Sequence, residues 1–239
     1  MKAYAATDIG RIRISNQDFV YKEVHPVGKL PNLFVVADGM GGHKAGEVAS
    51  KIAVETVVKS VKTSRKNDII YILQKAVNDA NAVVKELAST DSQYEGMGTT
   101  LVIATIVENM IYIANVGDSR LYFIDDDIHQ ITRDHSYVED LVSLGKIDKD
   151  EARTHVKKNI ITRAVGIDDD VDADYFEVQY ESGDKILMCS DGLTNMTEDV
   201  TIKTIVNGDG TIEEKTKKLV DTANQNGGKD NITVVLIEL

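Results

Sequence analysis

Five aspartates stand at the borders of short apolar runs in the 239-residue sequence, where strands are expected to begin or end. Strand ends are rigid, so carboxylates placed there can be aimed at a common point with little mobility. Several carboxylates at one point repel one another unless cations neutralise them, and hard oxygen donors without thiolates select Mg²⁺ or Mn²⁺ over zinc. The pattern therefore predicts a divalent-metal site. Its members are Asp18, Asp38, Asp118, Asp191 and Asp230.

The alternative explanation is that these aspartates lie in turns. Asp-Gly is the commonest turn dipeptide, and any one pair taken alone is better explained as a turn than as a ligand. A shared site is favoured because several such motifs follow one another along the chain. The glycines have a second use in that case, since a residue without a Cβ lets its carbonyl approach a metal closely. The motifs are the runs 38–43, 117–120, 190–192 and 230–231.

Composition limits the function classes. The formal charge of −12 would repel a nucleic-acid backbone or an anionic membrane surface, so we expect neither as a partner. The single cysteine, Cys189, lies in an apolar run and is expected to be a small buried hydrophobe rather than a nucleophile. No apolar run reaches the length that spans a bilayer, and the N-terminus lacks the apolar region of a signal peptide. We therefore expect a cytoplasmic protein.

Runs rich in valine and isoleucine, bounded by glycine, asparagine or aspartate, predict strands over 33–37, 99–107, 110–116, 120–124, 185–189 and 232–237. The short connections between residues 99 and 124 predict an antiparallel meander of three strands. Helical periodicity predicts helices over 49–61, 69–87 and 212–223. Antiparallel strand groups and paired helices without strict βαβ alternation favour an α+β layered domain.

Three other patterns carry no separate function. The acidic run 168–174 is not a calcium loop of the EF-hand type, because Ala173 and Gln179 occupy the positions that need glycine and glutamate. The glycine-containing run 39–46 lacks the Gly-Lys-Ser/Thr of a nucleotide-binding loop. The consecutive residues of Asp134-His135-Ser136 cannot form a local triad, so we expect a structural turn near the site.

Further motifs occur in order between and around the aspartates, at 7–10, 96–100, 134–136 and 161–166. With this full set the sequence resembles, over nearly its whole length, the PPM family of metal-dependent protein phosphatases, also called PP2C, in its compact bacterial form. The resemblance implies one domain over residues 1–239. It also implies a four-layer α-β-β-α sandwich of two antiparallel sheets flanked by helix pairs, with the metal site at one end of the sheets. A mobile flap is implied at about residues 143–163, beside the cleft.

The resemblance implies a role for each core ligand. Asp38 would bridge two metals, and the Gly39 carbonyl would bind one of them. Asp191 and Asp230 would complete the ligands of the first metal. Asp18 would support the site through bound water.

Three further residues receive roles from the resemblance. Asp118 matches the position that holds a third, weaker metal in bacterial members. Arg13 matches the arginine that grips the substrate phosphate, and His43 matches the proposed general acid. From the residues alone, a solvent-exposed loop histidine explains His43 equally well, and a surface arginine is the simplest explanation of Arg13. In the implied mechanism, two cations activate a water that attacks phosphorus in line, without a covalent phosphoenzyme.

The implied function is hydrolysis of phosphoserine and phosphothreonine in proteins at a binuclear Mg²⁺ or Mn²⁺ centre. We expect a monomer that acts on phosphorylated proteins and opposes a bacterial serine/threonine kinase. The alternatives are a two-metal nuclease or small-molecule phosphoesterase, a non-catalytic phosphoprotein-binding module, and a phosphatase specialised for one regulatory phosphoprotein. The acidic charge argues against a polynucleotide substrate. The presence of Asp38, Asp191 and Asp230 argues against a binding module that has lost its metals.

Overall fold

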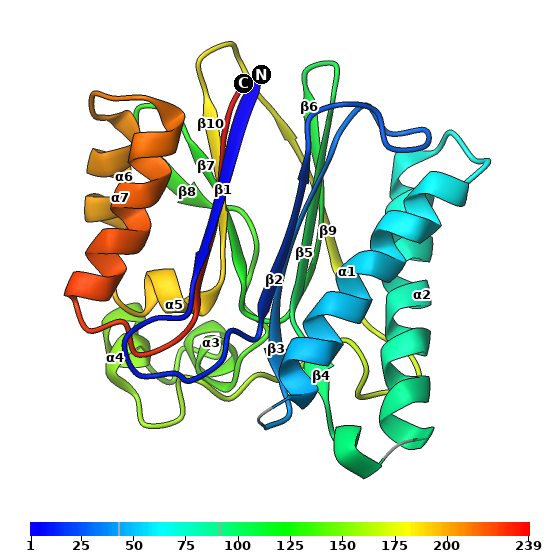
Figure 1. Cartoon of the computed structure of the whole chain (residues 1–239). Helices are drawn as coiled ribbons and strands as arrows, with labels where there is room; N and C mark the ends of the chain where they lie inside the picture. The colour runs from blue at the N-terminus through cyan, green and yellow to red at the C-terminus, as the bar shows by residue number, and fades with distance from the viewer. Residues whose placement is uncertain (43, 91) are drawn as a thin grey trace.

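Two antiparallel sheets pack face to face between two pairs of helices, which gives the four layers seen in Figure 1. The computed structural model describes residues 1–42, 44–90 and 92–239. The expected α-β-β-α sandwich is therefore confirmed. Both ends of the chain lie at the same end of the sandwich, at the top of Figure 1.

The sheets differ in their strand order. The first, on the left in Figure 1, has the order β1-β11-β10-β7-β8, and the second has the order β2-β3-β5-β6-β9, with β4 paired to β3. The strands of the first sheet are β1 (Lys2–Asp8), β7 (Arg120–Ile124), β8 (Ile128–Gln130), β10 (Lys185–Cys189) and β11 (Ile232–Glu238). Those of the second are β2 (Asp18–Glu23), β3 (Leu33–Met40), β4 (Gly98–Thr99), β5 (Leu101–Val107), β6 (Met110–Val116) and β9 (Asp174–Gln179).

The long helices cover the outer faces of the sheets (Figure 1). The second sheet is covered by α1 (Ala45–Thr63) and α2 (Ile69–Thr90), and the first by α6 (Asp199–Asn207) and α7 (Ile212–Gln225). The short helices are α3 (Tyr137–Ser143), α4 (Lys149–Thr154), α5 (Asp191–Thr194) and the 3-10 helix η1 (Ser92–Tyr94). No helix within the described ranges is both long enough and apolar enough to cross a membrane.

The central strands read as continuous apolar runs because both of their faces are buried. Successive side chains of a strand point to opposite faces. In β3, Phe34 and Val36 pack between the two sheets, whereas Val35 packs under α1 and α2. In β10, Met188 packs between the sheets and Cys189 packs toward α6 and α7. Cys189 is fully buried, as expected.

One predicted feature of the fold is wrong. Strands β5 and β6 form a hairpin, but β6 and β7 belong to different sheets, so residues 99–124 do not form a three-stranded meander. Strand β7 pairs with β10 instead. The connection of residues 117–119 carries the chain from one sheet to the other. A short connection limits the distance between two strands to roughly 10 Å, and stacked sheets are also about 10 Å apart, so sequence spacing alone cannot distinguish the two arrangements.

Candidate metal centre

The five predicted aspartates lie at one end of the sandwich, where strands of both sheets begin or end (Figure 1). Asp18 at the start of β2 is directly opposite Asp38 in β3. Asp191 begins α5 just after β10, and Asp230 precedes β11, the strand next to β10. Asp118 lies on the connection between the two sheets. The topology therefore brings together carboxylates that are more than 200 positions apart in the sequence.

Two threonines fix the backbone of Asp38. The Asp38 N–H donates to Thr100 Oγ1 at 2.9 Å. The Asp38 carbonyl accepts from Thr99 Oγ1 at 2.9 Å and from the Thr100 N–H at 2.8 Å. The Thr100 hydroxyl also lies 2.7 Å from the hydroxyl of Ser119, on the connection that carries Asp118. The same short segment thus holds two of the predicted ligands in place.

The glycines that follow two of the aspartates are not turn residues. Gly39 lies within β3, and a Cβ there would come 1.9 Å from the carbonyl oxygen of Gly46 at the start of α1. Gly192 lies in α5, and its Cβ would come 1.9 Å from the carbonyl oxygen of Asn231. Close approach of two backbones therefore requires both glycines. The turn explanation fails at these two positions.

Two carboxylate oxygens in the site are buried without a partner. Asp18 is 6% exposed, and its Oδ2 accepts from Ser190 Oγ at 2.7 Å. Asp191 Oδ2 accepts from Asn195 Nδ2 at 2.8 Å. In both aspartates the other oxygen, Oδ1, has no hydrogen-bond partner within the part of the chain that the structure describes. An unsatisfied buried carboxylate oxygen is costly, and a cation would satisfy it.

Burial and mutual repulsion raise the pKa of several of these carboxyl groups. Burial raises the pKa of Asp18 to about 6 and that of Asp118 to about 7. Burial, followed by the charge of Asp18, raises the pKa of Asp38 well above its usual range. Burial and then the charge of Asp118 have the same effect on the pKa of Asp191. Such groups ionise together only when positive charge is close by.

The available donors fit Mg²⁺ or Mn²⁺, because they are carboxylates and a backbone carbonyl without a thiolate. Within residues 1–42, 44–90 and 92–239, no group of three or more His, Cys, Asp or Glu side chains forms a ready-made cation cage. The carboxylates are therefore neighbours in burial and in charge. Their convergence on shared ions is a proposal rather than an observed set of contacts.

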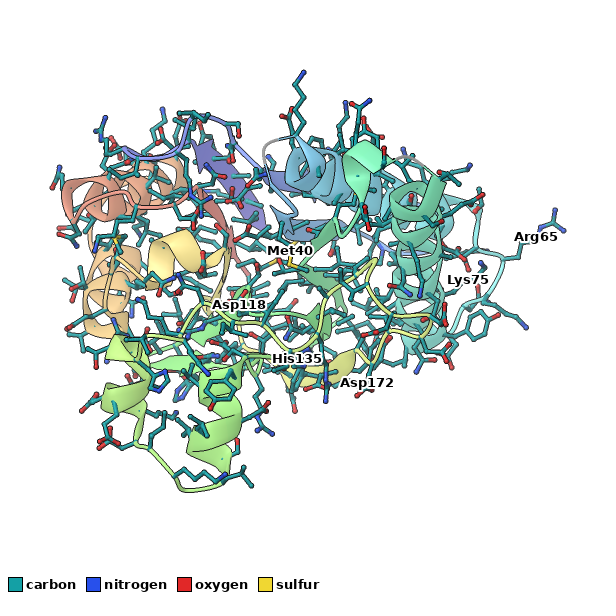
Figure 2. The ribbon with its side chains drawn as sticks, turned by 90° about the horizontal axis from the view of Figure 1, so that it is seen from below. Met40, Arg65, Lys75, Asp118, His135 and Asp172 are labelled. Atoms are coloured by element: carbon teal, nitrogen blue, oxygen red, sulfur yellow. The ribbon has the colours of Figure 1, made fainter. Side chains whose placement is uncertain are left out.

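His135 anchors the loop that carries Asp118. The ring nitrogen Nδ1 of His135 accepts from the Gly117 N–H at 3.2 Å. The backbone N–H of His135 donates to the Gly117 carbonyl at 2.9 Å. These contacts agree with the structural role expected from the 134–136 run. In Figure 2, Asp118 and His135 lie near the middle of the end that holds the aspartates, whereas Arg65 and Lys75 lie at the outer edge.

Arg13 reaches the site from the loop between β1 and β2. Its Nη2 donates to Asp230 Oδ2 at 2.7 Å, and its side chain is 47% exposed. The guanidinium therefore stands beside one of the predicted metal ligands and remains open to solvent. A substrate phosphate at this position would compete with Asp230 for the same donor.

Asn231 is a residue of the site whose contribution the sequence did not predict. Its buried side chain donates from Nδ2 to the carbonyl oxygens of Ile9 and Ser15, both at 2.9 Å. Its Oδ1 accepts from the Gln17 N–H at 2.8 Å. Asn231 thus holds both ends of the loop that carries Arg13. An asparagine at the start of a buried strand was the available signal, because a buried amide must be hydrogen-bonded.

A cavity of about 190 Å³ lies next to the candidate centre. Its lining includes the acidic residues Asp118 and Asp191 and the basic residues Lys149, Arg153 and Lys158. The three basic residues belong to the segment 143–163, which contains α4. The segment predicted to be a flap therefore faces the site, and its mobility stays a prediction.

The predicted general acid, His43, lies outside the described residues, between Gly42 and Lys44. Its role also stays a prediction.

Comparison with known proteins gives one consistent result. Residues 11–236 match the protein phosphatase 2C family. The chain is 40% identical over 247 residues to the serine/threonine phosphatase stp of Listeria innocua, with 100% of this chain and 96% of that protein covered. The S. agalactiae serine/threonine phosphatase superposes with a TM-score of 0.93 at 35% identity, with 100% and 99% covered. The catalytic domain of the phosphatase PstP, in complex with two manganese ions, gives 0.87 at 32% identity, with 99% and 97% covered. The chain therefore belongs to the protein phosphatase 2C family of metal-dependent serine/threonine protein phosphatases.

Proposed function

We propose that this chain hydrolyses phosphoserine and phosphothreonine in proteins at a binuclear Mn²⁺ or Mg²⁺ centre formed by its strand-end carboxylates. The observation that carries the proposal is the pair of buried oxygens, Oδ1 of Asp18 and of Asp191, that have no hydrogen-bond partner among the described residues, at the end of the sandwich that carries the five aspartates. The PstP structure with two manganese ions supports the number and kind of ion.

The core ligand roles follow the family resemblance. Asp38, which stands opposite Asp18 and has its backbone held by Thr99 and Thr100, would be the ligand shared by the two ions. The Gly39 carbonyl and the carboxylates of Asp191 and Asp230 would complete one ion's protein ligands. Asp18 would support the site through bound water.

Asp118 is assigned to a third ion. It lines the cavity together with Asp191. His135 holds Gly117 and Thr100 contacts Ser119, so the backbone on both sides of Asp118 is held in place. Whether this ion is needed for turnover is decided by measuring the rate of a variant that lacks it.

When bound, the two ions supply an activated water nucleophile and neutralise the surrounding carboxylates. Arg13 binds two phosphate oxygens with its planar guanidinium and releases Asp230 as it does so. This holds the phosphorus in line and offsets the charge that develops on the phosphoryl oxygens. The serine or threonine alkoxide is a poor leaving group, so it needs a proton, which we assign to His43.

The substrates are phosphorylated proteins, and we propose that a bacterial serine/threonine kinase is the enzyme whose products this phosphatase consumes. The relatives from Listeria innocua and Streptococcus pneumoniae, which match over 96% and 98% of their length, are bacterial phosphatases, which supports this pairing. We further propose that the protein works as a cytoplasmic monomer. Purified enzyme should dephosphorylate the kinase of the same cell and its targets, and failure on all of them would refute the pairing.

The proposed chemistry is tested with a phosphothreonine peptide, using enzyme stripped with a chelator and then given Mn²⁺, Mg²⁺ or neither. Wild type should release phosphate only with a cation. Asp38→Asn should remain folded and lose this activity with both cations. Asp125→Asn is the matched control, because it makes the same change on an exposed aspartate of the β7–β8 turn.

Activity that survives the chelator, or an active Asp38→Asn protein, would contradict the binuclear mechanism. A folded wild type with bound cation that releases no phosphate from phosphothreonine or phosphoserine peptides would contradict general phosphatase activity.

A further inference from the structure

We propose that Lys158 is a positioning residue that acts through Asn195 to hold the carboxylate of Asp191 in its metal-binding orientation. This inference rests on the proposed function, because it takes Asp191 as a metal ligand. It assigns to one side chain of the segment 143–163 a direct effect on the ligand set. Lys158 and Asn195 are themselves neither metal ligands nor phosphate-binding groups in the proposed function.

Asn195 determines which oxygen of Asp191 is available. Its Nδ2 donates to Asp191 Oδ2 at 2.8 Å, and its backbone N–H donates to the Asp191 carbonyl at 2.8 Å. The single turn of α5 thus fixes the backbone and the side chain of Asp191 together. Asp191 Oδ1 is left buried and without a partner among the described residues, so this is the oxygen that a cation would use.

Lys158 determines which way the Asn195 amide faces. Its Nζ donates to Asn195 Oδ1 at 2.9 Å. An ammonium group can only donate hydrogen bonds, and an ionised carboxylate can only accept them. With Lys158 on one side and Asp191 on the other, only one amide orientation satisfies both partners. The reversed amide would set its NH₂ against the ammonium and its oxygen against the carboxylate.

The position of Lys158 is tied to the same loops that carry the site. The Tyr137 N–H donates to the Ile160 carbonyl at 2.8 Å, and the Thr162 N–H donates to the His135 carbonyl at 2.8 Å. His135 in turn holds Gly117, next to Asp118. The C-terminal part of the segment 143–163 is therefore anchored close to the cavity. This anchoring lets Lys158 reach α5.

The neighbouring lysine provides a control with the same charge. Lys157 places its Nζ 5.1 Å from the centre of the Tyr137 ring rather than on Asn195. Removing either lysine takes one positive charge from the same segment. Only the loss of Lys158 removes the hydrogen bond to the amide.

A simple effect of charge and the proposed positioning effect have opposite signs. A lysine near the centre repels cations, so an effect of charge alone predicts that Lys158→Met binds Mn²⁺ more tightly. Loss of positioning predicts weaker Mn²⁺ binding, because the Asn195 amide is then free to turn and the Asp191 carboxylate is free to rotate. Loss of a group that orients a metal ligand typically weakens metal binding by roughly 10–100-fold.

The test is calorimetric titration of the metal-free full-length protein with Mn²⁺. Asn195→Ala should weaken the tightest binding step by about 10-fold, and Lys158→Met should weaken it by a smaller factor of about 3-fold. Lys157→Met should leave it unchanged or slightly tighter. Lys158→Arg should restore most of the affinity, since arginine can also donate to Oδ1. In the double variant, Lys158→Met should add nothing to Asn195→Ala.

Tighter Mn²⁺ binding by Lys158→Met, or equal effects of Lys158→Met and Lys157→Met, would overturn the proposal. Unchanged binding by Asn195→Ala would also overturn it. Thermal unfolding of each variant shows whether weaker binding reflects loss of the fold. Lys158→Arg and Lys157→Met keep the comparison decisive if Asn195→Ala does not fold.

A second measurement separates failure of this proposal from failure of the proposed function. If wild type binds no Mn²⁺, the proposed metal centre is wrong. The NMR signal of the Asn195 side-chain NH₂ in the metal-free protein then decides the positioning claim. Lys158→Met should shift this signal and speed its exchange with water, and Lys157→Met should do neither. A signal that Lys158→Met leaves unchanged would overturn the proposal whatever the metal result.

Discussion

The two ends of the sandwich both carry aspartates next to strands, but their surroundings shift the pKa in opposite directions. At the end that holds the candidate centre, burial raises the pKa of Asp18 to about 6 and that of Asp118 to about 7. At the other end, the turn between β7 and β8 exposes Asp125 and Asp127. Backbone hydrogen bonds from Asp127 and Ile128 lower the pKa of these two groups, respectively.

The difference shows what turns a strand-end aspartate into a candidate ligand. An exposed turn supplies N–H donors and water, so its aspartates are already satisfied. At the end that holds the candidate centre, two carboxylate oxygens, Oδ1 of Asp18 and of Asp191, are buried and have no partner among the described residues. Burial without a partner, rather than the position at a strand end, distinguishes the two groups.

The largest effect is expected when Asp191, a buried aspartate of the candidate centre, is replaced. Asp191→Asn should lower the rate of phosphopeptide hydrolysis by about 10³-fold, because a neutral amide is a weaker ligand for the cations that would activate water and offset charge in the transition state. Initial rates at saturating Mn²⁺ measure this loss. Asp125→Asn should change the rate by less than about 2-fold, as expected for an exposed site away from the chemistry. Similar rates for the two variants would remove the functional distinction between the two ends.

Arg13 gives the second largest effect. Arg13→Ala should lower kcat/KM by about 10²-fold, because the guanidinium offsets charge on the transferring phosphoryl group. Arg13→Lys should recover only part of the loss, since an ammonium cannot bind two oxygens in one plane. Arg65→Ala is the control, because Arg65 lies at the outer edge of the molecule (Figure 2). An unchanged kcat/KM for Arg13→Ala would show that the exposed guanidinium does not contact substrate.

The sequence predicted the central strands well and the edge strands poorly. Strands such as β3 and β10 are buried on both faces, so their apolar runs are continuous. Strands β1 and β9 went unpredicted. They are edge strands without a continuous apolar run: small alanines fill much of β1, and Glu177 interrupts the apolar residues of β9. The wrong meander had a different cause. The short sequence between Val116 and Arg120 limits the distance between β6 and β7. Which sheet β7 joins depends on packing partners elsewhere in the chain.

The site shows the same limit. The aspartates could be predicted because each stands at a recognisable strand end. Asn195 and Asn231 could not, because their importance lies in hydrogen bonds to residues far away in the sequence. Asn195 contacts Lys158, which is 37 positions away, and Asn231 contacts Ile9, which is 222 positions away. Such partners become visible only when the topology has brought them together.

The opposite pKa shifts predict how stability depends on pH. In the metal-free protein, the melting temperature should fall as the pH rises from about 5 to about 7.5. An aspartate in the unfolded chain titrates near pH 4, whereas burial holds the pKa of Asp18 at about 6 and that of Asp118 at about 7. The folded state therefore binds more protons over this range, so raising the pH favours unfolding. Asp125 and Asp127, whose pKa values are lowered, contribute no slope in this range.

Melting curves in chelator at several pH values measure the slope. Saturating Mn²⁺ should raise the melting temperature most at the high end of the range, where the carboxylates are ionised and ready to bind it. Asp118→Asn should flatten the slope in chelator, and Asp125→Asn should not. A melting temperature in chelator that is constant or rises with pH would contradict the raised pKa values.

Ion pairs give a smaller contrast between the ends. At the metal end, Arg120 binds Asp134 at 2.7 Å, and the two side chains are only 23% and 13% exposed. Arg120→Met should lower the free energy of unfolding by about 3 kcal/mol, because it leaves a poorly solvated carboxylate without its cationic partner. Urea denaturation in Mn²⁺ measures the change. A loss below about 1 kcal/mol would show that water reaches Asp134 after the substitution.

The smallest effect is expected for the ion pair of the other end. Lys203 lies 3.1 Å from Asp127, but the two side chains are 35% and 68% exposed. Water and salt screen such a pair, and holding two long side chains together costs entropy, so Lys203→Ala should change the free energy of unfolding by less than about 0.5 kcal/mol. Urea denaturation at low and high salt should give nearly the same difference from wild type. A loss as large as that of Arg120→Met would mean that solvent exposure does not determine how much an ion pair stabilises this protein. The contrast between the two ends would then rest on metal binding alone.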